Sequence, residues 1–400
     1  MTRRDFPILH QKVNGKQLIW FDNAATTQKP QSVIDELSRF YANDNSNIHR
    51  AAHELARRST DAYEGAREKV RNFINASATE EIVFVRGTTE GVNLIAQTYG
   101  RKYIREGDEI LISTLEHHAN IVPWQLLAKE KNAKLLVIPI NDRGDIILED
   151  YERLLSPRTK LVALAQVNNT FGTISPVKTM TEMAKRYNAR VVIDGAQSIA
   201  HTPVDVQNLN CDFFVFSGHK IYAPNGIGVL YGKKELLEIL PPWQGGGNMI
   251  RDVTFEETRF NVPPARFEAG TPNVADAAGL GAALDYVKRI GIPRIEKYEH
   301  ELTEYARAGL SKIKGLQLIG NPRERVSVVS FILEGIPTPE VGQLLDKEGI
   351  AVRAGHHCAQ PALRRMGLEA TVRPSFSFYN TKEEIDRLFE AVTKILNGKR

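Results

Sequence analysis

Arg190-Val-Val-Ile-Asp194 and Asp212-Phe-Phe-Val-Phe-Ser217-Gly-His-Lys220 are the two runs of sequence that decide the fold. Each is short, rich in β-branched or aromatic side chains, and bounded by polar residues or glycine, which predicts a buried β-strand. Parallel strands of an α/β sheet end at a common edge, where ligands bind. We therefore expect the carboxylate of Asp194 and the amine of Lys220 to lie side by side in one crevice.

An acid and a lysine in this arrangement suit a pyridinium cofactor. The carboxylate can face the ring nitrogen, and the lysine amine can form a Schiff base with an aldehyde. A lone lysine after a strand is, however, far more often an ordinary surface side chain. The interpretation therefore depends on what the other strand ends carry.

Similar apolar runs recur along the first part of the chain. They occupy residues 82–85, 109–113, 134–139, 160–165, 190–194, 212–217 and 227–231, and helical segments at 89–99, 120–131 and 177–188 separate several of them. Strand–helix alternation of this kind predicts an α/β fold with a mostly parallel sheet of about seven strands, covered on both faces.

The pattern changes after about residue 255, where a helix-rich stretch (274–314) gives way to mixed strands and helices. This predicts a second, smaller α+β domain. We expect an N-terminal arm at 1–20 that packs with the small domain, a large domain at 21–260, and an interdomain helix with the small domain at 261–400. A crevice between two domains is a common place for a small-molecule site.

Composition limits the classes of partner. The 400 residues are 42% hydrophobic and 25% charged with a net charge of +4, and no basic cluster is interleaved with aromatics, so nucleic acid is not an expected partner. No stretch approaches the roughly 20 apolar residues of a membrane span. Cys211 and Cys358 are the two cysteines, too few for a disulfide framework, which favours a reducing, cytoplasmic location.

The strand at 82–85 leads into Arg86-Gly-Thr-Thr-Glu-Gly-Val-Asn93, where Thr88 and Thr89 stand at a helix start. A glycine, two hydroxyls and a helix N-terminus make a phosphate cradle. A plain threonine N-cap is the simpler alternative. The next strand end carries His117, whose ring can stack on a heteroaromatic cofactor or move protons.

Three more strand ends carry polar groups of the same kind. Asn169 follows the strand at 160–165, Gln197 lies three residues past Asp194, and Ser217 and His219 flank Gly218 before Lys220. Five of the seven predicted strand ends thus bear residues suited to binding a cofactor, and independent coincidence at all five is hard to sustain. The neighbouring pairs His117-His118 and His356-His357 lack the spacing of metal ligands, so we expect no metal site.

The C-terminal part contributes Arg353-Ala-Gly-His-His-Cys358, in which Cys358 sits in a turn where a cationic neighbour would favour the thiolate. Cys211 begins a buried-looking strand and is expected to be inert. Arg373 stands in an otherwise apolar or hydroxyl-bearing strand and needs a carboxylate, either a structural acid or a substrate.

Together these residues resemble the class V aminotransferase family of fold-type I pyridoxal 5'-phosphate (PLP) enzymes, and within it the group II cysteine desulfurases of the SufS and CsdA kind. The similarity covers almost the whole chain. The motifs that carry it are Arg86-Gly-Thr-Thr-Glu-Gly-Val-Asn93, Glu116-His-His-Ala-Asn-Ile-Val-Pro-Trp124, Val192-Ile-Asp-Gly-Ala-Gln197, Phe216-Ser-Gly-His-Lys220, Phe267-Glu-Ala-Gly-Thr-Pro272 and Arg353-Ala-Gly-His-His-Cys358.

The resemblance implies a role for each candidate residue. Lys220 would bind PLP covalently and move the substrate Cα proton, and Cys358 would be the persulfide-forming nucleophile. Cofactor contacts would come from Asp194 at the ring nitrogen, His117 stacked on the ring, Gln197 at the phenolic oxygen, and Thr88, Thr89, Ser217, His219 and the neighbouring subunit's Thr271 at the phosphate. Asn169 would contact the cofactor as well. Arg373, Asn169 and Arg353 would bind the substrate.

The implied activity converts L-cysteine to L-alanine and a persulfide, in a homodimer that serves a sulfur acceptor of the SufE or SufU type for iron–sulfur cluster or other sulfur-cofactor synthesis. L-Selenocysteine is a further expected substrate. Another PLP-dependent lyase, epimerase or aminotransferase remains an alternative, as does a cofactor-free scaffold, which Lys220 argues against. Ala223, Asn225 and Asn168 depart from the usual motifs and leave substrate preference and acceptor open.

Overall fold

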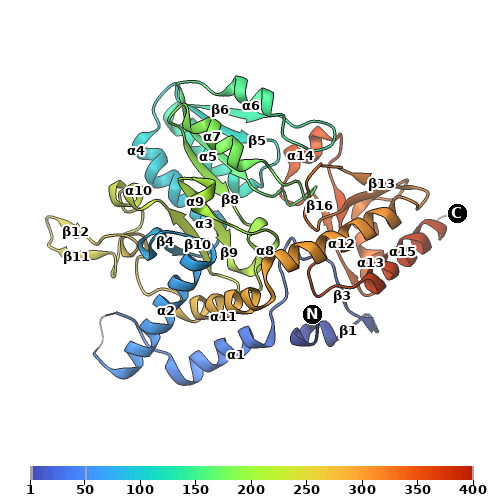
Figure 1. Cartoon of the computed structure of the whole chain (residues 1–400), viewed down its shortest axis with the longest axis horizontal. Coiled ribbons are helices and arrows are strands. Elements are labelled where there is room, and N and C mark those ends of the chain that lie inside the picture. The colour runs from blue at the N-terminus through green and yellow to red at the C-terminus, as the bar shows by residue number, and fades with distance from the viewer. Residues whose placement is uncertain (1–2, 50–51, 399–400) are drawn as a thin grey trace.

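In this computed structural model, which describes residues 3–49 and 52–398, a seven-stranded sheet forms the centre of the molecule (Figure 1). The strand order is β4-β10-β9-β8-β7-β5-β6. All neighbours are parallel except those of β10, which is antiparallel to β4 and β9. The predicted α/β class and mostly parallel sheet are therefore confirmed. The strands are β4 (Ile82–Val85), β5 (Glu109–Ser113), β6 (Lys134–Ile138), β7 (Thr159–Ala165), β8 (Arg190–Asp194), β9 (Phe213–Ser217) and β10 (Gly228–Gly232).

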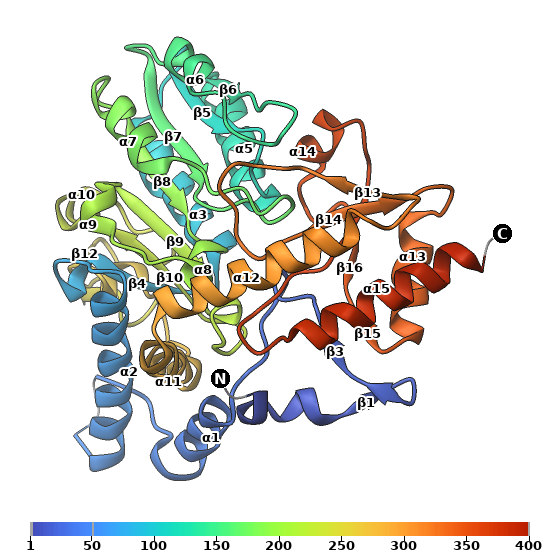
Figure 2. The ribbon, with the colours of Figure 1, turned by 45° about the vertical axis from the view of Figure 1, so that its right-hand side comes forward.

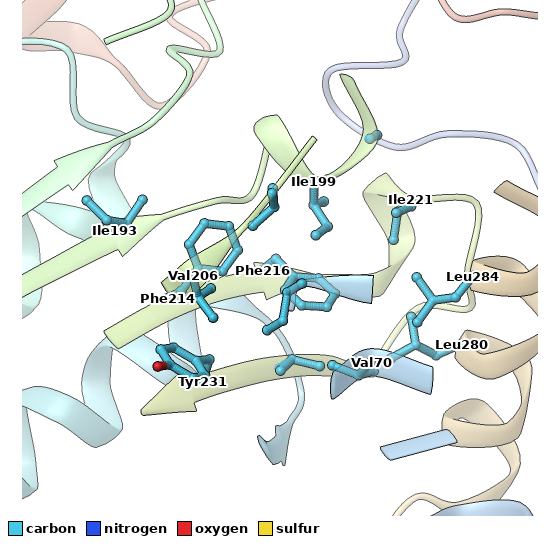
Figure 3. Close-up of a cluster of buried hydrophobic side chains, with 14 of the residues drawn as sticks. Val70, Ile193, Ile199, Val206, Phe214, Phe216, Ile221, Tyr231, Leu280 and Leu284 are labelled. Atoms are coloured by element: carbon cyan, nitrogen blue, oxygen red, sulfur yellow. The ribbon is translucent and has the colours of Figure 1, made fainter. Parts of the chain in front are cut away.

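Both faces of this sheet are buried, which is why its central strands read as continuous apolar runs. Successive residues of β9 alternate between two hydrophobic clusters: Phe214 and Phe216 belong to one, and Phe213 and Val215 to the other. Figure 3 shows Phe214 and Phe216 in the same cluster as Leu280 of α11 (Val274–Ile290).

Helices cover the two faces as the alternation predicts. The face that contains Phe214 is covered by α1 (Gln31–Arg39), α2 (Glu54–Phe73), α6 (Leu148–Leu154), α7 (Val177–Lys185), α8 (Ser198–His201), α9 (Val206–Leu209) and α11. The opposite face is covered by α3 (Thr88–Ile95), α4 (Arg101–Tyr103), α5 (Val122–Lys131) and α10 (Lys234–Ile239).

A smaller antiparallel sheet in the order β13-β14-β17-β16 lies beside the large one (Figure 2). It packs against three helices around a core of its own. The strands are β13 (Leu316–Ile319), β14 (Ser330–Leu333), β16 (Arg353–Gly355) and β17 (Thr371–Arg373), and the helices are α12 (Ile292–Leu310), α13 (Thr338–Lys347) and α15 (Lys382–Asn397). The short helix α14 (Gln360–Arg365) follows the cysteine-bearing turn.

The N-terminal segment is tied to this smaller sheet's side of the molecule. Its hairpin of β1 (Lys12–Val13) and β2 (Lys16–Gln17) leads to β3 (Ile19–Trp20), which pairs in parallel with β15 (Ile350–Ala351). The backbone thereby brings the loop after Trp20 close to the segment that begins at Arg353.

Three local features differ from the sequence-based prediction. The stretch 274–314 is helix-rich as expected but is divided into two helices, because Gly291 with φ of +88° separates α11 from α12. The apolar and hydroxyl-bearing run at 372–379 also predicts a strand, but only β17, three residues long, forms there. A hairpin of β11 (Ile250–Val253) and β12 (Thr258–Phe260) was not predicted, because its residues are solvent-exposed and carry no alternating apolar pattern. Within the described ranges, no helix combines the length and apolarity that a membrane crossing needs.

Gly228 provides a test of how closely β4, β10 and β9 pack beside the predicted phosphate cradle. A Cβ added there would lie 2.6 Å from Gly87 Cα and 2.6 Å from Phe216 O, both backbone atoms. We expect Gly228→Ala to lower the free energy of unfolding by about 1–3 kcal/mol, the usual cost of overpacking, as measured by urea denaturation. Gly65→Ala is the control, since nothing lies within 4 Å of its added Cβ; an equal loss of stability there would contradict the prediction.

Candidate active site

The carboxyl ends of the parallel strands and the turn after β16 enclose a cavity of about 560 Å³. Twelve of the thirteen predicted site residues line it, and the exception is Thr271. The twelve are Thr88, Thr89, His117, Asn169, Asp194, Gln197, Ser217, His219, Lys220, Arg353, Cys358 and Arg373.

Asp194 and Lys220 lie in this cavity close enough for each charge to affect the other's pKa. Asp194 is the last residue of β8, and the 3-10 turn Gly218–Lys220 directly follows β9, its parallel neighbour. Burial lowers the pKa of Lys220 to about 8, although the carboxylate of Asp194 opposes this shift. Burial also raises the pKa of Asp194, whose Oδ1 accepts a hydrogen bond from the Ala196 amide at 2.9 Å.

His117 is held as a neutral ring with a defined tautomer. Its Nδ1 accepts a hydrogen bond from the Ala119 amide at 3.1 Å, so the ring proton of the neutral form is on Nε2. Burial, and then the positive charge of Lys220, lower the pKa of His117 to about 3. The His117 ring, which lines the cavity, is therefore uncharged at neutral pH.

Hydroxyl and amide groups gather where β4 and β9 end. Ser217 Oγ lies 2.9 Å from Thr88 Oγ1 and accepts a hydrogen bond from the Thr88 amide at 2.9 Å, at the first turn of α3. His219 lines the same region, and burial followed by the charge of Lys220 lowers its pKa to about 4. Amide groups at a helix N-terminus together with hydroxyls form an anion-binding arrangement.

Arg373, on β17, lines the cavity and is 2% exposed. Its Nη1 donates to Asn169 O at 2.9 Å and its Nη2 lies 3.4 Å from Asp22, but its Nε is buried with no partner. Asp22 is engaged more closely by Arg353, at 2.8 Å. A buried guanidinium with an unused donor is suited to a carboxylate ligand.

Cys358 enters the cavity on a short, tightly held turn between β16 and α14. Its side chain is half-buried and lies near enough to Lys220 and Arg373 to raise the pKa of both, against the larger lowering by burial. Cys211, in contrast, is fully buried, and burial raises the pKa of its thiol to about 12. Only one of the two cysteines therefore has the setting of a reactive thiol.

Sequence reasoning missed two residues that shape the site. Asp22 begins a run of small residues, Asp22-Asn-Ala-Ala-Thr-Thr27, that carries no motif, yet it bridges Arg353 and Arg373. His357 is buried, and its Nε2 lies 2.8 Å from Thr371 Oγ1. Neither role has a local sequence signal. Asp22 pairs with arginines hundreds of residues away, and His357 contacts a residue on another short strand.

Thr271 lies away from the cavity in this chain. It lines two surface hollows, one with Trp243 and Glu268 and one with Tyr41 and Asn47. A role for Thr271 at the phosphate therefore requires a second subunit, as the resemblance implied.

The comparisons with known proteins agree with this geometry. The family model "Aminotransferase class-V" matches residues 19–388. A "Cysteine desulfurase" of Synechococcus elongatus is 62% identical over 99% of this chain, and this chain spans 63% of that protein's length. A "Probable cysteine desulfurase" of Halalkalibacterium halodurans is 51% identical, with 97% of this chain and 96% of that protein covered.

Solved structures share the fold. The cysteine desulfurase CsdA of Escherichia coli superposes with a TM-score of 0.92 at 40% identity, over 99% of this chain and 97% of the other. This chain spans only about 60% of the length of the curated relatives that head the comparison, and nearly all of others. The match of one family model to most of the residues, with relatives of this identity, shows that the chain belongs to the class V aminotransferase family.

Proposed function

We propose that this chain is a PLP-dependent cysteine desulfurase, which removes sulfur from L-cysteine to give L-alanine and a persulfide on Cys358. One observation carries the proposal: a half-buried thiol shares a cavity with a lysine of lowered pKa and a buried acid. The names of the relatives at 62% and 51% identity support it.

The residues present fit PLP. A buried carboxylate of raised pKa suits a pyridine nitrogen that carries a proton, and a flat neutral imidazole suits the ring face. Thr88, Ser217 and the first amides of α3 supply donors for a phosphate next to Gly87, where an added Cβ would lie 3.1 Å from Ser217 Oγ. When bound, PLP supplies an electron sink at the substrate Cα.

Within this arrangement Lys220 has two tasks. Its amine of lowered pKa would hold the cofactor covalently, and the same amine could take a proton from the substrate Cα and return one to the product. Asp194 would pair with the ring nitrogen and favour its protonated form. Gln197, whose Nε2 donates to Ala24 O at 2.7 Å, would face the phenolic oxygen.

Cys358 performs the sulfur transfer. Its thiolate attacks the substrate sulfur, a new S–S bond forms, and the electron pair of the broken C–S bond passes to the carbon skeleton, which a proton completes to L-alanine. No external oxidant or reductant is needed for this step. Release of the sulfur from the persulfide requires a thiol acceptor, for which a protein of the SufE or SufU type is proposed.

Arg373, with Asn169 and Arg353, is proposed to bind the substrate carboxylate. Because a hydrogen bond to a charged group is worth about 1.5–3 kcal/mol, we expect Arg373→Lys to lower kcat/KM for L-cysteine by roughly 10- to 100-fold, mainly through a higher KM. Steady-state alanine release measures this effect. Arg364→Ala, which removes an exposed arginine paired with Glu369, should leave KM unchanged; an unaltered KM in Arg373→Lys would contradict the assignment.

The activity itself is tested with purified protein, L-cysteine and a reductant. We expect visible cofactor absorbance and equal amounts of L-alanine and sulfide. A colourless protein that stays inactive after incubation with PLP would contradict the proposal, and release of a product other than alanine would favour the lyase, epimerase or aminotransferase alternative. L-Selenocysteine is a proposed second substrate for the same assay.

A homodimer and a division at residues 20 and 260 are also proposed. Phe255, at the tip of the β11–β12 hairpin, is fully exposed, and Val253 and Val262 beside it are more than half exposed. The hairpin projects from the molecule in Figure 1. Burial of such an apolar projection against a second copy would favour association. Mass measurement by light scattering tests the dimer.

A further inference from the structure

The turn that carries Cys358 has an unusual backbone. His357 and Cys358 have φ of +54° and +53°, so two successive residues with side chains adopt the left-handed region. This conformation costs a non-glycine residue roughly 1–2 kcal/mol. Such a turn persists only where surrounding contacts hold it.

Contacts from other segments hold part of the turn. Asn169 Nδ2 donates to His357 O at 2.7 Å, the His118 amide donates to Cys358 O at 2.8 Å, and His357 Nε2 lies near Thr371. These contacts fix both carbonyls and the buried histidine ring. They leave the Cys358 amide to be satisfied within the turn itself.

His356 satisfies that amide. Its Nδ1 accepts the hydrogen bond from the Cys358 N–H at 3.0 Å, and the Ala359 amide donates to His356 O at 2.9 Å. A side-chain acceptor two residues before the donor is the geometry by which asparagine and aspartate stabilise turns. The His356 ring also stacks on His118, with centroids 5.7 Å apart and an interplanar angle of 26°.

We infer that His356 is a positioning residue for the nucleophile, acting as a neutral Nδ1 acceptor that keeps the Cys358 turn in its left-handed form with the thiol in the cavity. The inference rests on the proposed function for its effect on catalysis, but the effect on the turn is independent of it. His118 contributes through its backbone amide, and the stacking of the two rings is secondary.

Three variants separate the effect of the His356 hydrogen-bond acceptor from the effect of its ring stacking. His356→Asn retains an acceptor for the amide two residues on and cannot stack, His356→Phe retains a stacking ring and has no acceptor, and His356→Ala lacks both. A neutral hydrogen bond is worth about 0.5–1.5 kcal/mol. We therefore expect kcat for L-cysteine to fall about 2- to 10-fold in the Phe and Ala variants, with little change in KM, and to stay near wild type in the Asn variant.

Hydrogen–deuterium exchange of the peptide spanning 356–360 in the holoenzyme is the readout that does not depend on activity. Exchange is expected to accelerate in the Phe and Ala variants and to match wild type in the Asn variant and in His10→Ala, an exposed histidine elsewhere. Any other pattern overturns the inference. If the Phe variant exchanged at the wild-type rate, stacking of the ring would be responsible; if the Asn variant exchanged as fast as the Ala variant, an acceptor at this position would not be sufficient. A wild-type protein that makes no alanine would overturn the proposed function instead, and the exchange pattern would still report on the turn.

Discussion

Lys220→Ala is expected to abolish turnover of L-cysteine and to remove the visible absorbance of lysine-bound cofactor. The amine lies in the cavity with Asp194, and burial lowers its pKa to about 8, which makes the neutral form easier to reach than for an exposed lysine. Loss of a group that moves protons in the transition state costs about 10²–10⁴-fold in rate. Absorbance spectra and alanine release from L-cysteine measure both effects.

Two further variants make this result specific. Lys220→Arg keeps a positive charge and should be as inactive as the alanine variant, because a guanidinium stays protonated and cannot act as nucleophile or base. Lys234→Ala removes an exposed lysine shortly after β10 and should behave as wild type. A Lys220→Ala protein that retained more than a tenth of the wild-type rate would rule out the assigned role.

Cys358→Ser is expected to keep the cofactor absorbance and lose sulfur transfer from L-cysteine. The hydroxyl fits the turn but is a far weaker nucleophile toward sulfur than a thiolate. Removal of a covalent nucleophile lowers kcat by about 10³-fold or more in comparable enzymes. Persulfide on the protein, detected by mass spectrometry after mixing with L-cysteine, should be present in wild type and absent from the variant.

Cys211→Ala is the matched control for this variant. Cys211 is fully buried in the core of the large sheet and its thiol pKa is raised to about 12, so it offers no thiolate. The control should lose stability but keep persulfide formation. Full sulfur transfer by Cys358→Ser to an acceptor protein would contradict the assignment, because the sulfur would then have bypassed Cys358.

The strand ends were predictable because their signal is local. The runs at 190–194 and 212–217 are apolar and short, and a polar or catalytic residue follows each, so that parallel pairing brings Asp194 and Lys220 to one edge. The structure bears out the sheet and gathers the five strand ends around one cavity. The assigned roles of these residues remain predictions that the experiments above address.

Other features have no local signal. The pairing of β3 with β15 joins segments that are more than 300 residues apart, and the β11–β12 hairpin carries no alternating apolar pattern. Asp22 is an example. The small residues around it do not indicate that it forms ion pairs with two arginines more than 300 positions away.

The sequence by itself determined the fold class, the residues at the edge of the large sheet and the contrast between Cys211 and Cys358. Periodicity and turn chemistry act over a few residues, so they can be read along the chain. Only the tertiary structure decided how the C-terminal sheet closes over that edge, leaving Arg373 Nε without a partner and the Cys358 amide bonded to His356. This closure brings together segments that are distant in the sequence. The burial and desolvation that it produces therefore cannot be inferred from a local sequence pattern.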